Sequence, residues 1–199
     1  RWIIWCITAS TITLGVGSEG LAENTKLDFW DTQRRGANCF NEAVAREWWA
    51  AARAAGIEFV RLAPNKWTSS HRDFLIGNAD RYQGLIGADL KLLREVLALA
   101  DSAGIKVVLT TLSLPGSRWR QQNGGRSDLR LWEDTSYWAQ AAEFWRDFAM
   151  EMRSQPCIVG YNLHNEPTPE LASGRSTDSS SRILNAVYVQ IRNGIRDVD

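Results

Sequence analysis

Short apolar runs alternate with longer amphipathic stretches along most of the chain. The short runs have the length of strands, and the longer stretches repeat apolar residues every three or four positions, which is typical of helices. Gly56 and Gly104 each follow one of the longer stretches directly, where the end of a helix favours glycine. The pattern predicts strands at 37–40, 57–63, 106–112 and 158–164, and helices at 43–55, 89–103, 137–152 and 182–196.

One part of the chain repeats itself. Residues 54–60 (AAGIEFV) resemble residues 102–108 (SAGIKVV), so the unit of helix, glycine and apolar strand occurs twice. Such repetition marks a repeated structural unit, and alternation of strands with helices predicts a parallel sheet. The links from helix to strand are short, whereas those from strand to helix are long, at 64–88, 113–136 and 165–181.

Long loops at one end of a parallel sheet are typical of a (β/α)8 barrel, whose active site lies at that end. We therefore expect an α/β fold, a TIM barrel truncated to about four βα units, because a complete barrel takes about 250 residues. A doubly wound sheet is less well supported, since no G-x-G-x-x-G follows the first strand. A complete α/β protein of 199 residues that covers its sheet edges by dimerising is the third possibility.

The N-terminal stretch differs from the rest of the chain. Arg1 precedes an apolar run over 2–16, and the small residues of Gly20–Ala22 follow at the spacing of a signal-peptidase site. This order predicts a signal peptide at 1–22 and a secreted protein, extracellular or periplasmic, with residues 23–199 as the N-terminal half of the predicted barrel. An N-terminal membrane anchor is the alternative.

Composition excludes some kinds of partner. The formal net charge is zero, which gives no reason to expect binding to nucleic acid. The 10 Trp residues indicate a large core, an aromatic-lined cleft or both, since each ring is large and its N–H needs a partner when buried.

The cysteines and histidines are few. Cys39 lies near the end of the first predicted strand and Cys157 just before the fourth, so they lie at opposite ends of the sheet. Disulfide geometry requires Cα atoms within about 7 Å, so we expect two free, structural thiols. His71 and His164 are the only histidines, and nothing in the sequence indicates a zinc site or a cofactor.

The fourth predicted strand runs directly into a carboxylate. Because side chains alternate along a strand, Gly160, Asn162, His164 and Glu166 share one face, which we expect to point into the barrel. Pro167 restricts Glu166 to extended geometry at the mouth of the barrel. A carboxyl group half-shielded by aromatic walls has a raised pKa, as a general acid requires. The alternatives are a helix N-cap and a surface glutamate.

An arginine occupies the inward face of the second strand. Arg61 alternates with Val60 and Leu62 and shares its face with Phe59 and Ala63. A guanidinium on an inward face needs an acceptor, so we expect Arg61 to hold an acidic residue of the site in its ionised form. A structural ion pair is the alternative.

Amides and indoles gather on the same side. Amides at strand ends bind sugar hydroxyls or cap turns, and loop indoles stack on sugar rings or anchor the loops. The candidates for these roles are Asn38, Asn65, Asn165, Trp67, Trp119 and Trp132. The helical Trp48, Trp49, Trp138 and Trp145 are expected to pack in the core.

Four segments in this order resemble the family 5 glycoside hydrolases, the cellulase-type members of the clan of retaining (β/α)8 glycosidases. The segments are Arg35–Asn38, Val60–Leu62, Leu114–Gly116 and His164–Pro167. The resemblance covers the chain from about residue 34 onward. Leu112 and Ser113 occupy places where many relatives carry a histidine pair.

The resemblance implies roles for the matched residues. Glu166 is the general acid/base, Asn165 contacts the sugar at the point of cleavage, and Arg61 lies beside the nucleophile. That nucleophile is a second glutamate at the end of strand seven, which this sequence does not reach. Further substrate-binding residues are expected to be Asn38, Trp67 and Trp119.

The expected reaction is hydrolysis of β-glycosidic bonds in a polysaccharide or oligosaccharide, with retention and without a cofactor or metal. The complete enzyme is expected to be a monomer with no membrane contact after signal cleavage, and the 199-residue chain alone to be inactive. The alternative function is a non-catalytic glycan-binding barrel that keeps Glu166 for its shape.

Overall fold

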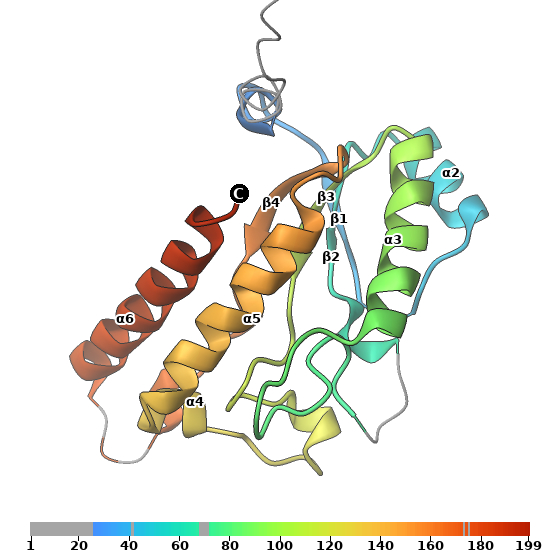
Figure 1. Cartoon of the computed structure of the whole chain (residues 1–199). Helices are drawn as coiled ribbons and strands as arrows, with labels where there is room; N and C mark the ends of the chain where they lie inside the picture. Colours follow the sequence, from blue (N-terminus) through green and yellow to red (C-terminus); the bar gives the residue numbers. More distant parts are fainter. Residues whose placement is uncertain (1–25, 41, 68–71, 173, 175) are drawn as a thin grey trace, which may run out of the picture.

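The structure is a computed structural model, and it describes residues 26–40, 42–67, 72–172, 174 and 176–199. The predicted signal peptide therefore lies outside the described residues. Four parallel strands form one sheet in the order of the sequence (Figure 1). The strands are β1 (Gly36–Cys39), β2 (Phe59–Leu62), β3 (Lys106–Thr110) and β4 (Ile158–Asn162). The four predicted strands and their parallel arrangement are confirmed.

The four predicted helices are also present, and shorter elements lie in the loops. The long helices are α2 (Arg46–Ala54), α3 (Gly87–Ser102), α5 (Ser136–Met152) and α6 (Thr177–Arg196). The short elements are the helix α4 (Arg130–Glu133) and the 3₁₀ turns η1 (Pro64–Lys66), η2 (Arg120–Gln122) and η3 (Pro169–Leu171). Helix α6 begins five residues earlier than predicted because the Ser176 side chain caps it, accepting a hydrogen bond from the Ser179 N–H.

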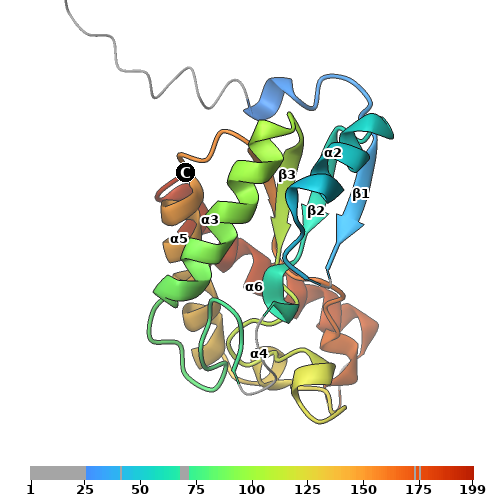
Figure 2. The same cartoon turned by 90° about the vertical axis from the view of Figure 1, so that its right-hand side faces the viewer.

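One face of the sheet packs against the helices. Figure 2 shows α2 and α3 in front of β2 and β3, and α5 packs closely against α6. Val60 and Leu62 of β2 are fully buried, as are Val107 and Leu109 of β3. The helical tryptophans belong to this core as predicted: Trp49 and Trp145 are fully buried, and Trp48 and Trp138 pack against it. In β2 and β3, every second side chain therefore points into this core.

Both cysteines that the structure describes are free and buried, as expected. Burial raises the pKa of the Cys39 thiol, with a smaller contribution from the Glu42 charge. Burial raises the pKa of Cys157 to about 12. At neutral pH both are therefore inert thiols that fill space in the core.

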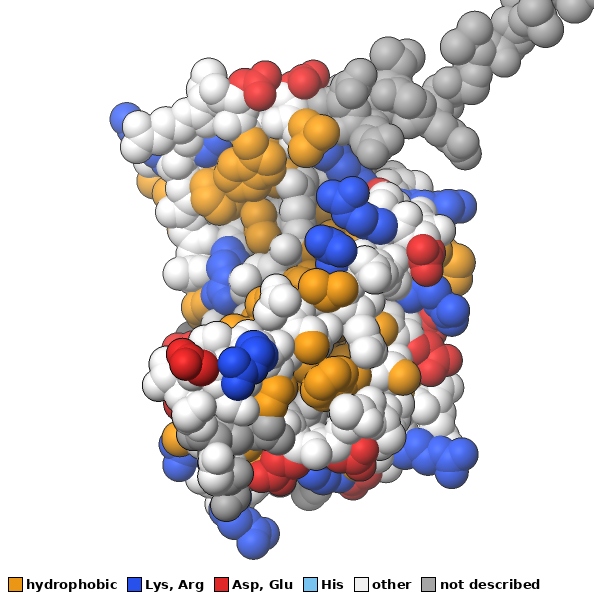
Figure 3. Space-filling model, turned by 90° about the vertical axis from the view of Figure 1, so that its left-hand side faces the viewer, with side chains coloured by type: hydrophobic (Ala, Val, Ile, Leu, Met, Phe, Trp, Pro, Cys, Tyr) orange, Lys and Arg blue, Asp and Glu red, His pale blue; other side chains and the backbone are white. Residues whose placement is uncertain are grey.

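An aromatic cluster covers the amino-terminal ends of the strands. The Trp30 ring lies 5.1 Å from the Phe59 ring, and its indole N–H donates to the Val159 carbonyl at 2.9 Å. Gly36 is required beneath it, because a Cβ there would lie 2.3 Å from the Phe59 ring. Trp30 still exposes 42% of its surface, and Figure 3 shows hydrophobic side chains reaching the surface on one face. None of the described helices is long and apolar enough to cross a membrane.

A tight turn after β3 joins the two long loops at the other end of the sheet. Leu114 and Ser117 exchange backbone hydrogen bonds across it, at 3.0 and 2.9 Å. The Gly116 N–H donates to the Ala79 carbonyl at 2.8 Å, and the Gly116 carbonyl accepts from the Leu131 N–H at 2.7 Å. The turn therefore fixes the loop after β2 and the start of α4 to one point.

We expect Gly116→Ala to be strongly destabilising. Gly116 has a φ of +74°, and a Cβ there would lie 2.5 Å from the Tyr137 ring. Gly124 has a similar φ of +60° with no atom within 4 Å of the added Cβ, so it provides a matched control. Urea unfolding should give a loss of about 1 kcal/mol for Gly124→Ala from backbone strain alone. Overpacking should add about 2 kcal/mol for Gly116→Ala, and equal losses would contradict this account.

Candidate active site

A pocket of about 480 Å³ opens at the carboxyl ends of β3 and β4. It brings together three of the predicted site residues, Asn165, Glu166 and Trp119, with the buried His164 and Ser117 beneath them. The rest of its lining comes mainly from the loop after β3, and includes Leu112, Arg118, Arg120, Asp128, Thr168 and Leu171. A ligand at this end of the sheet would contact backbone loops held by rigid strands, as in barrel enzymes.

Glu166 lies at the edge of this pocket in a conformation that the sequence did not predict. Strand β4 ends at Asn162, and Glu166 follows in a bend with a φ of +47°. The expectation of extended geometry before Pro167 is therefore wrong. The Asn165 N–H turns to the Thr111 carbonyl at 2.9 Å, so the chain leaves the sheet before Glu166. Glu166 is exposed, and the aromatic shielding expected for it is incomplete within the described residues.

A non-glycine residue in the left-handed region is strained by about 1–3 kcal/mol. Such strain persists only where the surroundings determine the backbone, and it often occurs at functional sites. Glu166 and Leu75 are the non-glycine residues of the described chain with this conformation. The structure therefore singles out the same carboxylate as the sequence motif does.

Arg61 lies beneath the pocket and reaches across the sheet from β2. Its Nη2 donates to the Oδ1 atoms of Asn162 at 2.7 Å and of Asn165 at 2.9 Å. Thr110 of the intervening strand donates to the same Asn162 oxygen at 2.6 Å. The expectation that Arg61 holds an acidic residue in its ionised form stays a prediction: among the described residues its hydrogen-bond partners include two amide oxygens, and the charge of Glu166 acts on it from nearby.

Partial burial lowers the pKa of Arg61, while the charge of nearby Glu166 opposes that change. The pKa of a guanidinium lies far above neutral, so the group stays protonated at any working pH despite this shift. It also lies over the Phe40 ring, with Cζ 5.4 Å from the ring centroid. The floor of the site is therefore a fixed positive charge close to the carboxylate of Glu166.

His164 is a site residue to which the sequence analysis gave no role. Its side chain is buried, its Nε2 shares a hydrogen bond of 3.2 Å with the Ser117 Oγ, and its ring lies 6.1 Å from that of Trp132. Burial lowers its pKa to about 4, with the Thr111 carbonyl opposing that change. The available signal was the alternation that places His164 on one face with Glu166. His71 lies outside the described residues.

The other predicted residues divide between the site and the scaffold. Asn65 is buried, and its Oδ1 accepts a hydrogen bond from the Leu112 N–H at 2.7 Å. Trp67 packs edge-on against Phe74, with ring centroids 5.5 Å apart, and Trp132 is buried in α4. These three anchor loops, so a stacking role is not supported for Trp67 or Trp132.

Asn38 is exposed on β1, in register with Arg61, and lies outside the pocket. Trp119 is the loop indole that lines the pocket, and its buried Nε1 has no hydrogen-bond partner in the structure. Of the predicted stacking residues, Trp119 is therefore the one positioned to contact a ligand.

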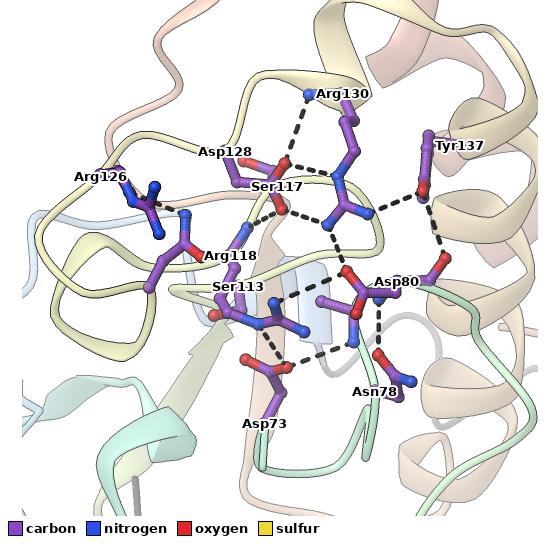
Figure 4. Close-up of polar contacts among 12 residues, drawn as sticks. Asp73, Asn78, Asp80, Ser113, Ser117, Arg118, Arg126, Asp128, Arg130 and Tyr137 are labelled. Carbon is purple, nitrogen blue, oxygen red and sulfur yellow. Dashed lines mark hydrogen bonds and ion pairs between the residues drawn. The ribbon is translucent and has the colours of Figure 1, made fainter. Parts of the chain in front are cut away.

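A chain of ion pairs fixes the loops around the pocket (Figure 4). Arg118 contacts Asp73 at 2.9 Å and Asp80 at 3.6 Å, and Arg130 contacts Asp80 at 2.7 Å and Asp128 at 2.8 Å. Asp73 and Asp128 are largely buried, and the Asp128 carboxylate also accepts from the Arg118 backbone N–H. The loop after β2 is thus bound to the loop after β3. No local sequence pattern predicts these ion pairs.

The described residues contain no group of three or more His, Cys, Asp or Glu side chains placed to hold a metal ion. The chemistry that these residues offer is that of a carboxylate, two amides, an arginine and an indole around a water-accessible pocket.

The buried His164 should make stability depend on pH. Its pKa is about 4 in the folded state against 6.5 when unfolded, so the unfolded state binds more protons between these values. Stability should therefore fall as the pH is lowered, by about 3 kcal/mol from pH 7 to pH 4. Urea unfolding across this range should show that loss in the wild type but not in His164→Gln. The same slope in both proteins would contradict the assignment.

The comparisons with known proteins agree with this geometry. Residues 23–199 match the family model described as Cellulase (glycosyl hydrolase family 5). No curated protein sequence matches the chain. Among solved structures, the Pseudomonas stutzeri endoglucanase Cel5A is similar with a TM-score of 0.57 and 20% identity, over 83% of this chain and 48% of that one.

Endo-glycoceramidase II from Rhodococcus sp. is similar with a TM-score of 0.63 and 20% identity, over 83% of this chain and 46% of that one. The chain thus spans just under half the length of these glycosidases, with which it shares the fold. The parallel sheet, its four βα units and the family match together confirm the predicted α/β fold of the TIM-barrel type, of which this chain spans about four βα units. The chain belongs to the cellulase family, glycosyl hydrolase family 5.

Proposed function

We propose that this protein hydrolyses β-glycosidic bonds, with Glu166 as the general acid/base. The observation that carries the proposal is a carboxylate at the end of β4, at the edge of a pocket with an indole and an amide beside it. Membership of the family and likeness to solved glycosidases support the same reaction class.

The contacts of Arg61 suggest how Asn165 binds substrate. Arg61 offers only donors, so the Oδ1 of Asn165 faces it and the amide NH₂ points elsewhere. That NH₂ is free to donate to a sugar hydroxyl next to Glu166. Trp119 provides an apolar surface for a sugar ring, while Arg61 itself stays beneath the pocket.

The mechanism we propose is double displacement with retention. A nucleophilic carboxylate attacks the anomeric carbon while Glu166 protonates the leaving oxygen, and Glu166 then deprotonates the water that releases the sugar. The two carboxyl groups of a retaining enzyme lie about 5–5.5 Å apart. We propose that the second carboxyl comes from sequence beyond residue 199, as the chain spans just under half of its solved neighbours. Without it, the 199-residue chain should not turn over.

The proposed substrate is a β-linked polysaccharide or oligosaccharide. One solved neighbour is named an endoglucanase and another an endo-glycoceramidase, and these names support a carbohydrate substrate. We also propose export by the signal peptide at 1–22, and a monomeric enzyme with no membrane contact after signal cleavage. Sequencing the coding DNA beyond Asp199 tests directly whether the reading frame continues and encodes the proposed second carboxyl group.

In the protein extended beyond Asp199, we expect Glu166→Gln to lower kcat on cello-oligosaccharides by about 10²–10⁴-fold, because a poor leaving group needs a proton. An aryl β-cellobioside with a dinitrophenolate leaving group needs little acid assistance, so its glycosyl transfer step should be affected far less. This difference between substrates is the signature of a general acid.

The matched control is Glu170→Gln, which changes another exposed glutamate, in η3 and outside the pocket lining. It should retain wild-type rates. Hydrolysis by Glu166→Gln at the wild-type rate would overturn the catalytic role of Glu166. Tight glycan binding without turnover, in both the wild type and Glu166→Gln, would favour the non-catalytic glycan-binding barrel.

A further inference from the structure

His164 is a buried polar side chain that the proposed mechanism does not use. It exposes only 5% of its surface, its Nε2 shares a hydrogen bond with Ser117 Oγ, and its Nδ1 makes no well-formed hydrogen bond, although the nearby Thr111 carbonyl favours the protonated ring. A leucine or methionine would fill such a place without leaving a polar atom unsatisfied. Burying this histidine therefore costs free energy that an apolar side chain would not cost, and we expect a role for it beyond filling space.

That role follows from what lies on either side of the residue. Glu166 is two residues further along the chain, in the strained left-handed conformation. Between them, the Asn165 N–H donates to the Thr111 carbonyl at 2.9 Å. The bond from His164 to Ser117 is a second attachment of the same segment, this time through a side chain. Two attachments within two residues leave the backbone little freedom.

The partner of His164 is itself held firmly. Ser117 closes the turn after β3 through its reciprocal backbone bonds with Leu114, and its side chain is buried. The same turn is fixed to Ala79 and Leu131 through Gly116. A bond to Ser117 therefore ties the end of β4 to the most constrained point of the neighbouring loops.

We propose that His164 is a positioning residue for Glu166: through its hydrogen bond with Ser117 it holds the Asn165–Glu166 backbone so that the carboxyl group lies at the pocket. The catalytic meaning of this positioning rests on the proposed function. The positioning itself is a property of the folded chain and can be measured without any substrate.

The charge state of the histidine suits this role. Burial lowers its pKa to about 4, so the ring is neutral at working pH and brings no second positive charge close to Glu166. A lysine or arginine at this place would stabilise the ionised carboxylate and oppose proton donation. Other charged groups around the pocket are Arg61 beneath it, and Arg118, Arg120 and Asp128 in its wall.

The direct test is the backbone conformation of Glu166, read by NMR from its ¹³Cα and ¹³Cβ shifts and its three-bond HN–Hα coupling. His164→Met keeps a long side chain but cannot bond to Ser117, and Ser117→Ala removes the same bond from the other side with little loss of volume. Both variants should move the Glu166 signals away from left-handed values. The double variant should behave like either single one, since all three lack one and the same bond.

His164→Gln is the conservative variant, because its amide nitrogen reaches the position of the ring Nε2. It should restore the left-handed signals. Gln121→Ala is the control, since Gln121 is an exposed residue of the same pocket wall and should leave the Glu166 signals unchanged. A purely structural histidine would alter the melting temperature without moving Glu166, so the two roles are distinguished.

In the protein extended beyond Asp199, the positioning role predicts that Ser117→Ala lowers kcat about 10- to 100-fold with little change in KM, as misplacement of a catalytic group does. Unchanged Glu166 signals in both Ser117→Ala and His164→Met would overturn the proposal. If the signals move but Glu166→Gln hydrolyses normally, the proposed function fails while the positioning by His164 stands.

Discussion

The site depends first on one partly buried cation, Arg61, whose donors need acceptors. Arg61 is in β2, yet its hydrogen bonds reach Asn162 and Asn165 at the end of β4, across the intervening β3. Because a guanidinium offers donors in a fixed plane, these bonds fix both the distance across the sheet and the direction of each amide. The polar groups beside the pocket are therefore placed by the register of β2, β3 and β4, which the buried apolar residues of these strands hold together.

Above this floor, the loops act as one body rather than as separate segments. The turn at Gly116 joins them through backbone bonds, while Arg118 joins them through the buried carboxylate of Asp73 and Arg130 through the exposed one of Asp80. Such pairs contribute little net stability compared with an apolar contact, but they resist rearrangement, since removing one partner leaves an uncompensated charge. Their effect is to hold the part of the pocket wall that carries Trp119 in place.

Much of this organisation could be read from the sequence. Apolar periodicity and the glycines after helices predicted four strands and four helices in the right order, because burial enforces that pattern locally. The motif around Glu166 and the inward Arg61 were found for the same reason. Sequence patterns did not predict the partners of Arg61, the left-handed φ of Glu166 or the ion pairs of Arg118. Each of these depends on contacts between residues that are far apart in sequence. The alternation along the strand placed His164 on one face with Glu166, but only its contact with Ser117 in the structure suggested a role for it.

The two glycines that follow η2 have a consequence for how this pocket can diversify. Gly124 and Gly125 both have positive φ and open space around them, whereas Gly116, a few residues earlier, is enclosed on several sides. The same loop thus has a root where no added side chain fits and a tip that is closed by its own hydrogen bonds but has open space around it. Insertions at the tip would reshape the rim of the pocket while leaving the root untouched. For the proposed hydrolase, substrate range can therefore change in this loop without altering the residues around Glu166.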